Sequence, residues 1–443
     1  PRPPPTRPIF STPMATPRSK KRQKVSTGSW EPIKPSHWAD HMCNPIREIV
    51  EGLNIPKEVD GKKLIPLSIG DPTVFGNLKM CKVFKDAVVE NVKTEKFNGY
   101  CPSTGRPEAR AAVADYYQTK TSQLTADDVV ICSGGSGALE IAFKGLLSPG
   151  DNILLPKPGF ALYETMVQQF GSECRYYNCL PEKGWEADLA HMESLVGSRT
   201  KAIMLNNPSN PCGSVFSKEH LLDIIAIARR NRLPIITDEI YGNMVFSGTT
   251  FHPVASLTQD VPVLAIGGTA KEFLVPGYRI GWILIHDRHG ILKHVVEGIK
   301  KLSQLIIGSN SLIQSCLPAI LTPKAGSAAW EERREWWDGT LSQIENNARF
   351  TCDFLSKVPG LSVVTPQGAM YVMVGIDIDA FDDTVTNDTE FTQKLLDEEA
   401  VFVIPGKCFG IPNFVRVVLS GPEDKLKDAY SRMANFCKRH AKL

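Results

Sequence analysis

Short apolar runs recur from about residue 125 onward and constrain the fold more than any other feature of this chain. The runs are rich in Ile, Leu and Val on both faces, which is typical of strands buried between two layers of helices. Most of the gaps are long enough for a crossover helix, and 136–147 and 218–231 have helical apolar spacing. The pattern predicts an α/β fold with a mostly parallel sheet. The five runs are Val129–Cys132, Asn152–Leu155, Ala202–Leu205, Pro234–Thr237 and Val261–Ile266.

One gap is too short for a crossover. The stretch from Ile266 to Tyr278 leaves little room for a helix, so we expect the next strand, Arg279–Ile285, to run antiparallel. Beyond Gly326 the pattern changes to that of a smaller α+β domain, with a helix at about 328–357 and a final helix after Pro422. Short strands are predicted near 362–365, 369–375, 402–404 and 414–419.

The start of the chain has a different composition. The first 30 residues contain seven Lys or Arg residues and no acid, and seven prolines lie among the first 17. Such a segment buries too little apolar surface to fold, so residues 1–42 are predicted to be a disordered basic tail. Its purpose stays open between a solvated tail, a nuclear address and an organelle transit peptide. The rest is expected to form an N-terminal arm (43–75) that packs with the small domain, a large domain (76–325) and the small domain (326–443).

Charge and composition exclude several classes of protein. The chain has 50 Lys and Arg against 48 Asp and Glu, a formal net charge of +2, which argues against a nucleic-acid binder. No run of about 18 apolar residues occurs, so no membrane span is expected.

The 11 cysteines include no CxxC pair and indicate reduced thiols. We therefore expect a cytoplasmic protein, with the mitochondrion as the alternative. His286 and His289 have no cysteine nearby, and no metal site is predicted.

Chemistry-bearing residues follow four of the predicted strands. They are the Gly/Ser turn 133–137, the amide-rich loop 206–213, the pair Asp238 and Tyr241, and Lys271. Taken singly, each has an ordinary structural explanation as a tight turn, a rigid loop, a helix cap or a surface lysine. In an open parallel sheet, however, the carboxyl ends of the strands meet at the edge where ligands bind.

Together these residues match one ligand. A lysine can form an imine with an aldehyde, a buried carboxylate can hold a pyridinium, and a phenol and an amide can bond a ring oxygen. Small residues at the start of a helix can hold a phosphate. The combination predicts pyridoxal 5′-phosphate (PLP) as cofactor.

At these positions the sequence resembles the fold-type I aminotransferases of the aspartate aminotransferase superfamily, and among them the enzymes that act on tyrosine. The resemblance runs from about Asn44 to His440. It is carried by Ser68–Leu78, Asn206–Lys218 (NNPSNPCGSVFSK), Asp238–Tyr241, Leu274–Arg288 (LVPGYRIGWILIHDR), Pro366–Gly375 (PQGAMYVMVG) and Asn413–Val417.

The resemblance assigns the residues around the reactive aldehyde and the ring of the cofactor. It implies that Lys271 binds the cofactor aldehyde and then shuttles the proton of the substrate, and that Asp238 holds the pyridinium N–H. It further implies that Asn210 and Tyr241 bond the ring oxygen and that Phe160 stacks on the ring with Tyr163 nearby.

The resemblance also assigns the anionic groups of cofactor and substrate. Gly135, Ser136 and Arg279 would hold the phosphate, which Tyr100 would reach in the partner subunit of a homodimer. Arg416 would bind the substrate α-carboxylate, assisted by the backbone of Gly70.

The implied activity is a ping-pong transamination that moves the amino group of tyrosine, and of other aromatic amino acids, to 2-oxoglutarate or a related 2-oxo acid. Amino and oxo acids would be its partners, without nucleic acid or membrane. A broad-specificity enzyme, an aminotransferase for alanine or kynurenine, and a PLP-dependent lyase remain alternatives, since the same cofactor residues serve them.

The residue that meets a distal carboxylate is not identified by any motif. A fixed buried arginine would be costly against a neutral ring, whereas a mobile arginine at the mouth avoids that cost. Arg47, next to Ile46 just after the tail, is the candidate. The alternative is that Arg47 pairs with Glu48 or Glu51.

Overall fold

The computed structural model describes residues 32–40 and 42–442, and the chain divides into two compact units, 1–40 and 41–443. In the described part of the first unit, a short helix is formed by α1 (His37–Asp40). The predicted disordered tail falls largely on residues 1–31 and 41, which lie outside the described residues. All further elements belong to the second unit.

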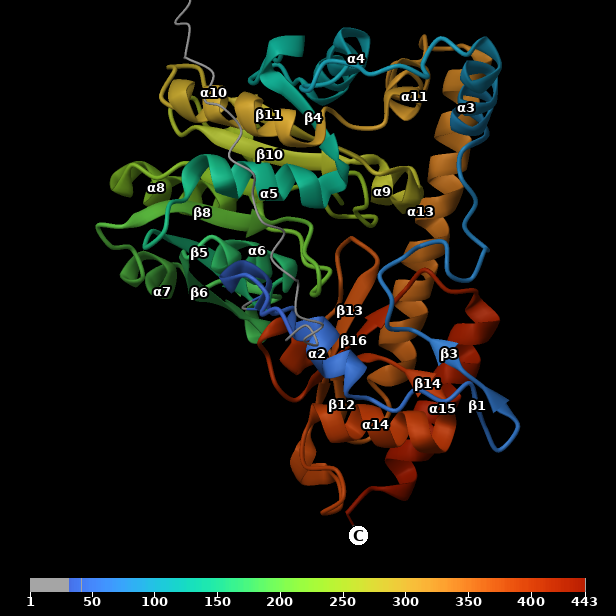
Figure 1. The fold of residues 1–443 in the computed structure, drawn as a ribbon. Coiled ribbons are helices and arrows are strands. Elements are labelled where there is room, and N and C mark those ends of the chain that lie inside the picture. Colours follow the sequence, from blue (N-terminus) through green and yellow to red (C-terminus); the bar gives the residue numbers. More distant parts are fainter. Residues whose placement is uncertain (1–31, 41, 443) are drawn as a thin grey trace, which may run out of the picture. The chain divides into compact units, whose positions relative to one another are not determined.

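An eight-stranded sheet forms the upper part of the second unit in the view of Figure 1, with the strand order β4-β11-β10-β9-β8-β5-β6-β7. From β10 to β6 all neighbours run parallel, and β11 is antiparallel to both β10 and β4. The predicted mostly parallel sheet and its antiparallel strand are therefore confirmed. The strands are β4 (Val129–Ser133), β5 (Asn152–Lys157), β6 (Glu173–Leu180), β7 (Glu186–Ala187), β8 (Thr200–Asn206), β9 (Ile235–Asp238), β10 (Val263–Gly268) and β11 (Ile280–His286).

Helices cover both faces of this sheet because its strands are apolar on both sides. Val129 and Ile131 of β4 pack into one buried cluster, whereas Val130 and Cys132 pack into another. The first face is covered by α4 (Pro107–Tyr117), α8 (Lys218–Asn231) and α12 (Leu317–Leu321). The second is covered by α5 (Gly134–Leu146), α6 (Leu162–Gln169) and α10 (Lys293–Leu302). The remaining helices of this part are α3 (Lys82–Thr94), α7 (Leu189–Ser194), α9 (Thr269–Glu272) and α11 (Ser311–Gln314).

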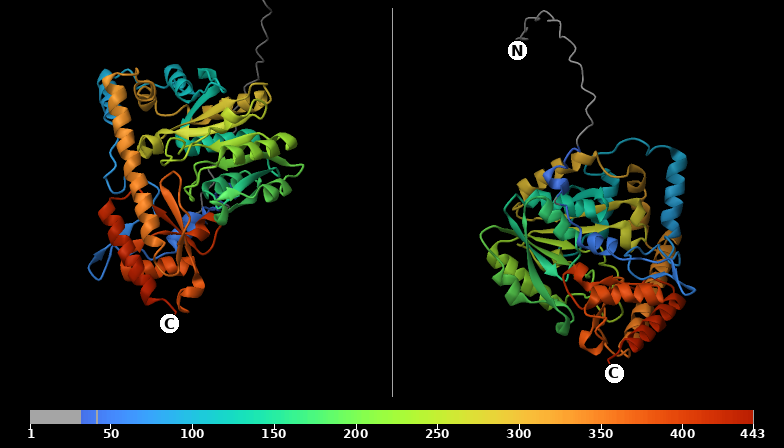
Figure 2. Two further views of the ribbon diagram at one scale, coloured as in Figure 1. Left: turned by 180° about the vertical axis from the view of Figure 1, so that it is seen from behind. Right: turned by 60° about the horizontal axis from the view of Figure 1, so that its bottom comes forward.

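A second, four-stranded sheet has the antiparallel order β12-β13-β16-β15. Its core is shared with three helices, of which α13 runs alongside the unit from the large sheet to this smaller one (Figures 1 and 2). This confirms the predicted fold class, a large parallel-sheet layer structure with a smaller α+β domain. The elements are β12 (Leu361–Val363), β13 (Tyr371–Ile376), β15 (Ile404–Pro405), β16 (Phe414–Val418), α13 (Ala328–Leu355), α14 (Asp388–Glu399) and α15 (Glu423–Arg439).

The prediction of a single strand at 402–404 is wrong, because the chain forms two short strands there. β15 joins the small sheet, whereas β14 (Val401–Phe402) pairs in parallel with β3 (Ile65–Pro66) from the N-terminal segment. Before β3 lie α2 (Pro45–Glu51) and the hairpin of β1 (Glu58–Val59) and β2 (Lys62–Lys63).

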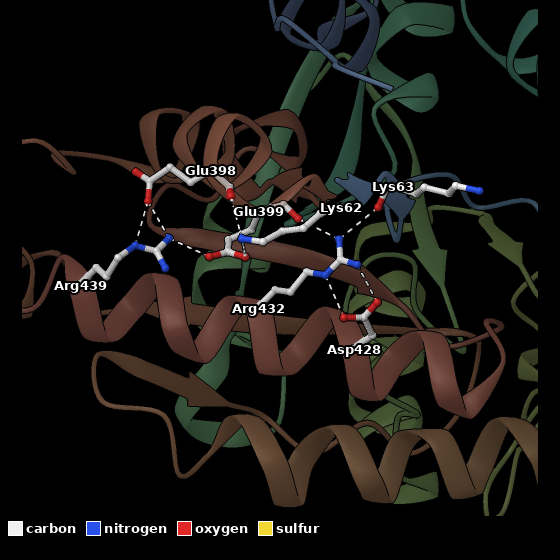
Figure 3. A network of polar contacts seen from close by, with 7 residues as sticks. All are labelled: Lys62, Lys63, Glu398, Glu399, Asp428, Arg432 and Arg439. Carbon is white, nitrogen blue, oxygen red and sulfur yellow. Dashed lines mark hydrogen bonds and ion pairs between the residues drawn. The ribbon is translucent and has the colours of Figure 1, made fainter. Parts of the chain in front are cut away.

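A network of charged side chains around one buried carboxylate fastens this hairpin to α14 and α15 (Figure 3). Glu399, only 1 % exposed, accepts from Lys62 at 2.6 Å and from Arg439 at 2.7 Å. Arg432 donates to the backbone carbonyls of Lys63 and Glu399. The network therefore fixes the β1–β2 hairpin to the two helices of the small domain. No helix within the described residues is long and apolar enough to cross a membrane.

Candidate active site

Loops that follow four strands of the large sheet meet at a cavity of about 600 Å³. They follow β4, β8, β9 and β10, at the carboxyl ends where open α/β sheets bind ligands. The small sheet and α2 complete the wall. Every predicted site residue lines this cavity except Tyr100. The predicted residues found there are Arg47, Gly70, Gly135, Ser136, Phe160, Asn210, Asp238, Tyr241, Lys271, Arg279 and Arg416.

Asp238 is a buried carboxylate at the end of β9. Its Oδ2 accepts from the Tyr163 hydroxyl at 2.8 Å, and its Oδ1 accepts from the Ile240 amide at 3.3 Å. Burial raises the pKa of Asp238 to about 6, although the two hydrogen bonds and the charge of Lys271 act to lower it. A buried carboxylate in this condition gains stability from a cationic N–H donor.

Lys271 lies in α9, directly after β10, and its amine donates to the carbonyl of Gly70. Beside it, the hydroxyls of Tyr241 and Tyr371 are 2.9 Å apart. Burial acts to raise the pKa of Tyr371, but the charges of Lys271 and Arg416, together with hydrogen bonds from Tyr241 and Lys271, leave that pKa below its usual value. A Cβ at Gly70 would clash with the Tyr371 hydroxyl, so glycine permits this close approach.

Arg416, on β16, is 5 % exposed. Its Nη1 donates to Asn210 Oδ1 at 2.8 Å and its Nη2 to the Ser68 carbonyl at 2.7 Å. Within residues 42–442, its Nε has no hydrogen-bond partner and no acid forms an ion pair with it. A buried guanidinium held only by neutral groups calls for an anion from outside the chain, and its geometry suits a carboxylate.

The start of α5 and Arg279 form an electropositive corner of the cavity. The helix begins at Gly134, two residues earlier than predicted, and Arg279 Nη2 donates to Ser136 Oγ at 2.9 Å. Gly134 has a φ of +74°, and a Cβ there would lie 2.6 Å from Arg279 Nη2. A helix N-terminus beside a guanidinium is electropositive and suits a phosphate.

The remaining wall is aromatic and aliphatic. Phe160 lies edge-on to Tyr163, with ring centroids 5.6 Å apart. Exposed Arg47 borders the mouth from α2, and none of the described residues forms an ion pair with it, Glu48 and Glu51 included. Aliphatic side chains near it come from Ile46, Val50, Ile55, Ile69 and Leu162.

The chemistry of this donor set fits PLP. The cavity offers an amine, a buried carboxylate that forms no ion pair with any described residue, an electropositive corner and an aromatic wall, each at a different strand end. Tyr100 is 89 % exposed and lies outside the cavity of its own chain. Among residues 32–40 and 42–442, no cluster of His, Cys, Asp and Glu has the arrangement of a metal site.

Three contributors escaped prediction from the sequence. Tyr371 lies within the stretch 366–375, but nothing local indicates that it meets Lys271 and Arg416. Asn206 accepts from the Asn210 amide at 2.7 Å and donates to the Asp238 carbonyl at 3.2 Å, so it fixes two loops. Ser68 contributes only its carbonyl, for which no side-chain signal exists.

Comparison with known proteins gives a consistent result. Residues 62–433 match the family model described as "Aminotransferase class I and II". The chain is 48% identical to a tyrosine aminotransferase of Dictyostelium discoideum, with 95% of this chain and 100% of that protein covered. It is 45% identical to a tyrosine aminotransferase of Homo sapiens, with 95% and 90% covered. A crystal structure of tyrosine aminotransferase from Leishmania infantum superimposes with a TM-score of 0.87 at 38% identity, covering 94% of this chain and 100% of that chain.

Proposed function

Because this chain belongs to the aminotransferase class I and II family of PLP-dependent enzymes, we propose that it moves the amino group of L-tyrosine to a 2-oxo acid. The acceptor is 2-oxoglutarate or a related acid, other aromatic amino acids also serve as donors, and the reaction is ping-pong. The observation that carries the proposal is Arg416, a buried guanidinium without an acidic partner among the described residues, in the same cavity as Lys271. The relatives named tyrosine aminotransferase support the choice of donor.

When bound, PLP supplies an aldehyde that reacts with amines and a ring that accepts the electron pair left on the substrate Cα. The chain's residues would hold it at four points. Asp238 would keep the ring nitrogen protonated, and Asn210 and Tyr241 would bond the ring oxygen. Ser136 and Arg279, with the backbone at Gly135, would bind the phosphate, and Phe160 would cover one ring face.

The substrate would be oriented by its α-carboxylate on Arg416, with the Gly70 backbone alongside. This brings Cα within reach of the Lys271 amine, which would remove the Cα proton and return it to the cofactor carbon as general base and acid. Tyr371 and Tyr241 would stabilise the charge on that amine through their paired hydroxyls. The side chain of an aromatic donor would then lie along the aliphatic wall near α2.

The distal carboxylate of 2-oxoglutarate requires a second cation. Arg47 lies at the mouth of the cavity and is exposed. It could therefore turn to the carboxylate and swing to solvent when a neutral ring binds, which avoids the cost of a fixed buried charge.

We further propose a homodimer in which Tyr100 completes the phosphate site of the other subunit. Tyr100 does not line the cavity of its own chain and is exposed. The apolar side chains of Leu305, Ile306 and Ile307 are exposed as well, Leu305 to 73 %. An apolar surface of this kind favours association. All described cysteines are free, which supports a reducing compartment such as the cytoplasm, with the mitochondrion as the alternative.

Alternative activities use the same cofactor contacts. An aminotransferase for alanine or kynurenine, a broad-specificity enzyme or a PLP-dependent lyase would differ only in what the aliphatic wall and Arg47 select.

A steady-state screen of amino donors against several oxo acids distinguishes them. Tyrosine with 2-oxoglutarate should give the highest kcat/KM and yield 4-hydroxyphenylpyruvate and glutamate in equal amounts. Alanine or kynurenine as the best donor would replace the proposed substrate. Loss of a substrate side chain without transfer of the amino group would indicate a lyase.

A further inference from the structure

Glu272 is the residue that follows Lys271 in the four-residue helix α9. It is 6 % exposed, yet it does not line the cavity that Lys271 enters. Successive residues of a helix project about 100° apart, so the two side chains leave the same turn in different directions.

The Glu272 carboxylate is surrounded by donors from three other parts of the chain. It accepts from the hydroxyl of Tyr116, from the hydroxyl of Tyr117 at 3.0 Å, and from Asn243 Nδ2 at 2.7 Å. Arg333 Nη2 lies 3.9 Å away and donates to the Tyr116 hydroxyl at 2.6 Å. The carboxylate is therefore the common acceptor of a buried polar cluster.

Two of these partners connect Glu272 to parts of the chain that carry or lead to cavity residues. Asn243 comes two residues after Tyr241, which faces Lys271. Arg333 lies in the first part of α13, the helix that continues to the small sheet carrying Tyr371 and Arg416 (Figure 1). Glu272 thus ties the helix of the lysine to the loop of Tyr241 and to the helix that leads to the substrate-binding arginine.

Short helices need such an anchor. α9 has only four residues, and no side chain caps its N-terminus. Its own backbone hydrogen bonds therefore hold it weakly. The carboxylate satisfies three donors at once, and no neutral side chain of the same length offers as many acceptor sites. Proton transfer by Lys271 depends on placing its amine accurately.

We propose that Glu272 is a positioning residue for Lys271, which fixes α9 so that the amine stays aligned with the substrate Cα and the cofactor. The proposal rests on the proposed function for its kinetic consequence, but its structural consequence is independent of the reaction. Glu272 touches neither substrate nor cofactor, so its loss should slow proton transfer and leave binding intact.

The test compares Glu272→Ala and Glu272→Gln in the PLP-loaded enzyme with Glu399→Ala as matched control. Glu399 is an equally buried carboxylate that bonds Lys62 and Arg439 and does not line the cavity. In Glu272→Ala, kcat should fall roughly 10- to 100-fold while KM for tyrosine and 2-oxoglutarate stays within about threefold. The α-deuterium isotope effect on kcat should rise. Glu272→Gln should have a kcat between those of the wild type and Glu272→Ala, because its single amide oxygen can still accept from Tyr116 and Asn243 while Tyr117 loses its acceptor.

Hydrogen exchange gives the readout that needs no turnover. Amides of 269–274 should exchange roughly tenfold faster in Glu272→Ala, whereas Glu399→Ala should lower the melting temperature without changing these amides or kcat. If Glu272→Ala does not fold, Glu272→Gln tests the proposal: its amides 269–274 should exchange faster than in the wild type, and its α-deuterium isotope effect should be larger. Unchanged exchange and kcat, or equal effects in both alanine variants, would overturn the proposal. Failure of the wild type to transaminate tyrosine would instead refute the proposed function.

Discussion

Tyr163 donates its hydroxyl hydrogen to Asp238 across 2.8 Å. The two residues come from the carboxyl ends of different strands, since Tyr163 lies in α6, which follows β5, and Asp238 is the last residue of β9. The bond works against burial, which raises the pKa of Asp238 to about 6. Tyr163 therefore helps to keep the carboxylate ionised near neutral pH, the state in which it can hold a protonated pyridine nitrogen.

Replacing Tyr163 by Phe should shift the acidic limb of the pH–rate profile. Without the hydroxyl the pKa of Asp238 rises, so the limb of kcat/KM should move up by about one pH unit. Tyr430→Phe is the matched control. Tyr430 is equally buried, its hydroxyl lies 2.7 Å from the Thr351 hydroxyl, and neither residue lines the cavity. A limb that stays in place in Tyr163→Phe would show that the bond does not tune Asp238.

Asp238 should also destabilise the cofactor-free protein at neutral pH. Its pKa is about 6 in the fold against an ordinary 3.8, so the folded state favours the protonated acid. Stability from this group is fully present below pH 4 and is lost as pH rises through 6, a difference of about 3 kcal/mol. Asp238→Asn should therefore raise the urea midpoint of the cofactor-free protein at pH 8 but hardly at pH 4.

Asp260 supplies a control of opposite sign. Its hydrogen bonds to Arg229 lower the pKa of Asp260 to about 2. Any stability that Asp260 contributes is present above its ordinary pKa and is lost as pH falls, so Asp260→Asn should matter less at pH 2 than at pH 8. Parallel pH curves for wild type and Asp238→Asn would contradict the assignment of Asp238.

Substitution of the two cavity arginines, Arg416 and Arg47, should raise KM for different sets of substrates. Arg416→Lys should raise KM for tyrosine, glutamate and 2-oxoglutarate alike, by about 10- to 100-fold, because all share the α-carboxylate. Arg47→Ala should raise KM by about 5- to 150-fold for glutamate and 2-oxoglutarate only, and leave tyrosine and pyruvate nearly unchanged. Steady-state kinetics with the four substrates measures both. Equal loss for all four in Arg47→Ala would mean that Arg47 is structural.

A mixture of two inactive variants should regain activity if Tyr100 acts across a homodimer. Tyr100→Ala lacks the phosphate contact it gives its neighbour, and Lys271→Ala lacks the amine. In a hybrid dimer, the subunit with intact Lys271 receives an intact Tyr100, so random subunit exchange should restore about a quarter of wild-type activity. No recovery after exchange, proven by mass spectrometry of hybrids, would exclude the shared site.

Sequence patterns predicted the central strands and most of the cavity because those features are local. The runs at Val129–Cys132 and Pro234–Thr237 are continuous and apolar, which identifies strands buried on both faces. β6 (Glu173–Leu180) escaped because its sequence ECRYYNCL mixes charges with aromatics, and several of its residues are only half-buried. The strand expected at 402–404 splits because its two halves find partners more than 300 residues and about 10 residues away, β3 and β16.

The polar contacts were harder to foresee than the strands. Lys271 and Asp238 could be placed at one sheet edge, since parallel strands end together. Tyr371 could not, because it arrives from the other sheet and its meeting with Tyr241 depends on how the two sheets face each other. The same holds for Glu272, whose four partners are brought together only by tertiary packing.

The most direct test of the central claim is a half-reaction with L-tyrosine alone. Purified PLP-loaded enzyme should release close to one equivalent of 4-hydroxyphenylpyruvate per active site without any oxo acid, and should turn over continuously once 2-oxoglutarate is added. Lys271→Ala, which keeps Asp238, Arg416 and the electropositive corner, should release almost none under the same conditions. A wild type that releases no oxo acid from tyrosine, or a Lys271→Ala variant that releases as much as the wild type, would contradict the account.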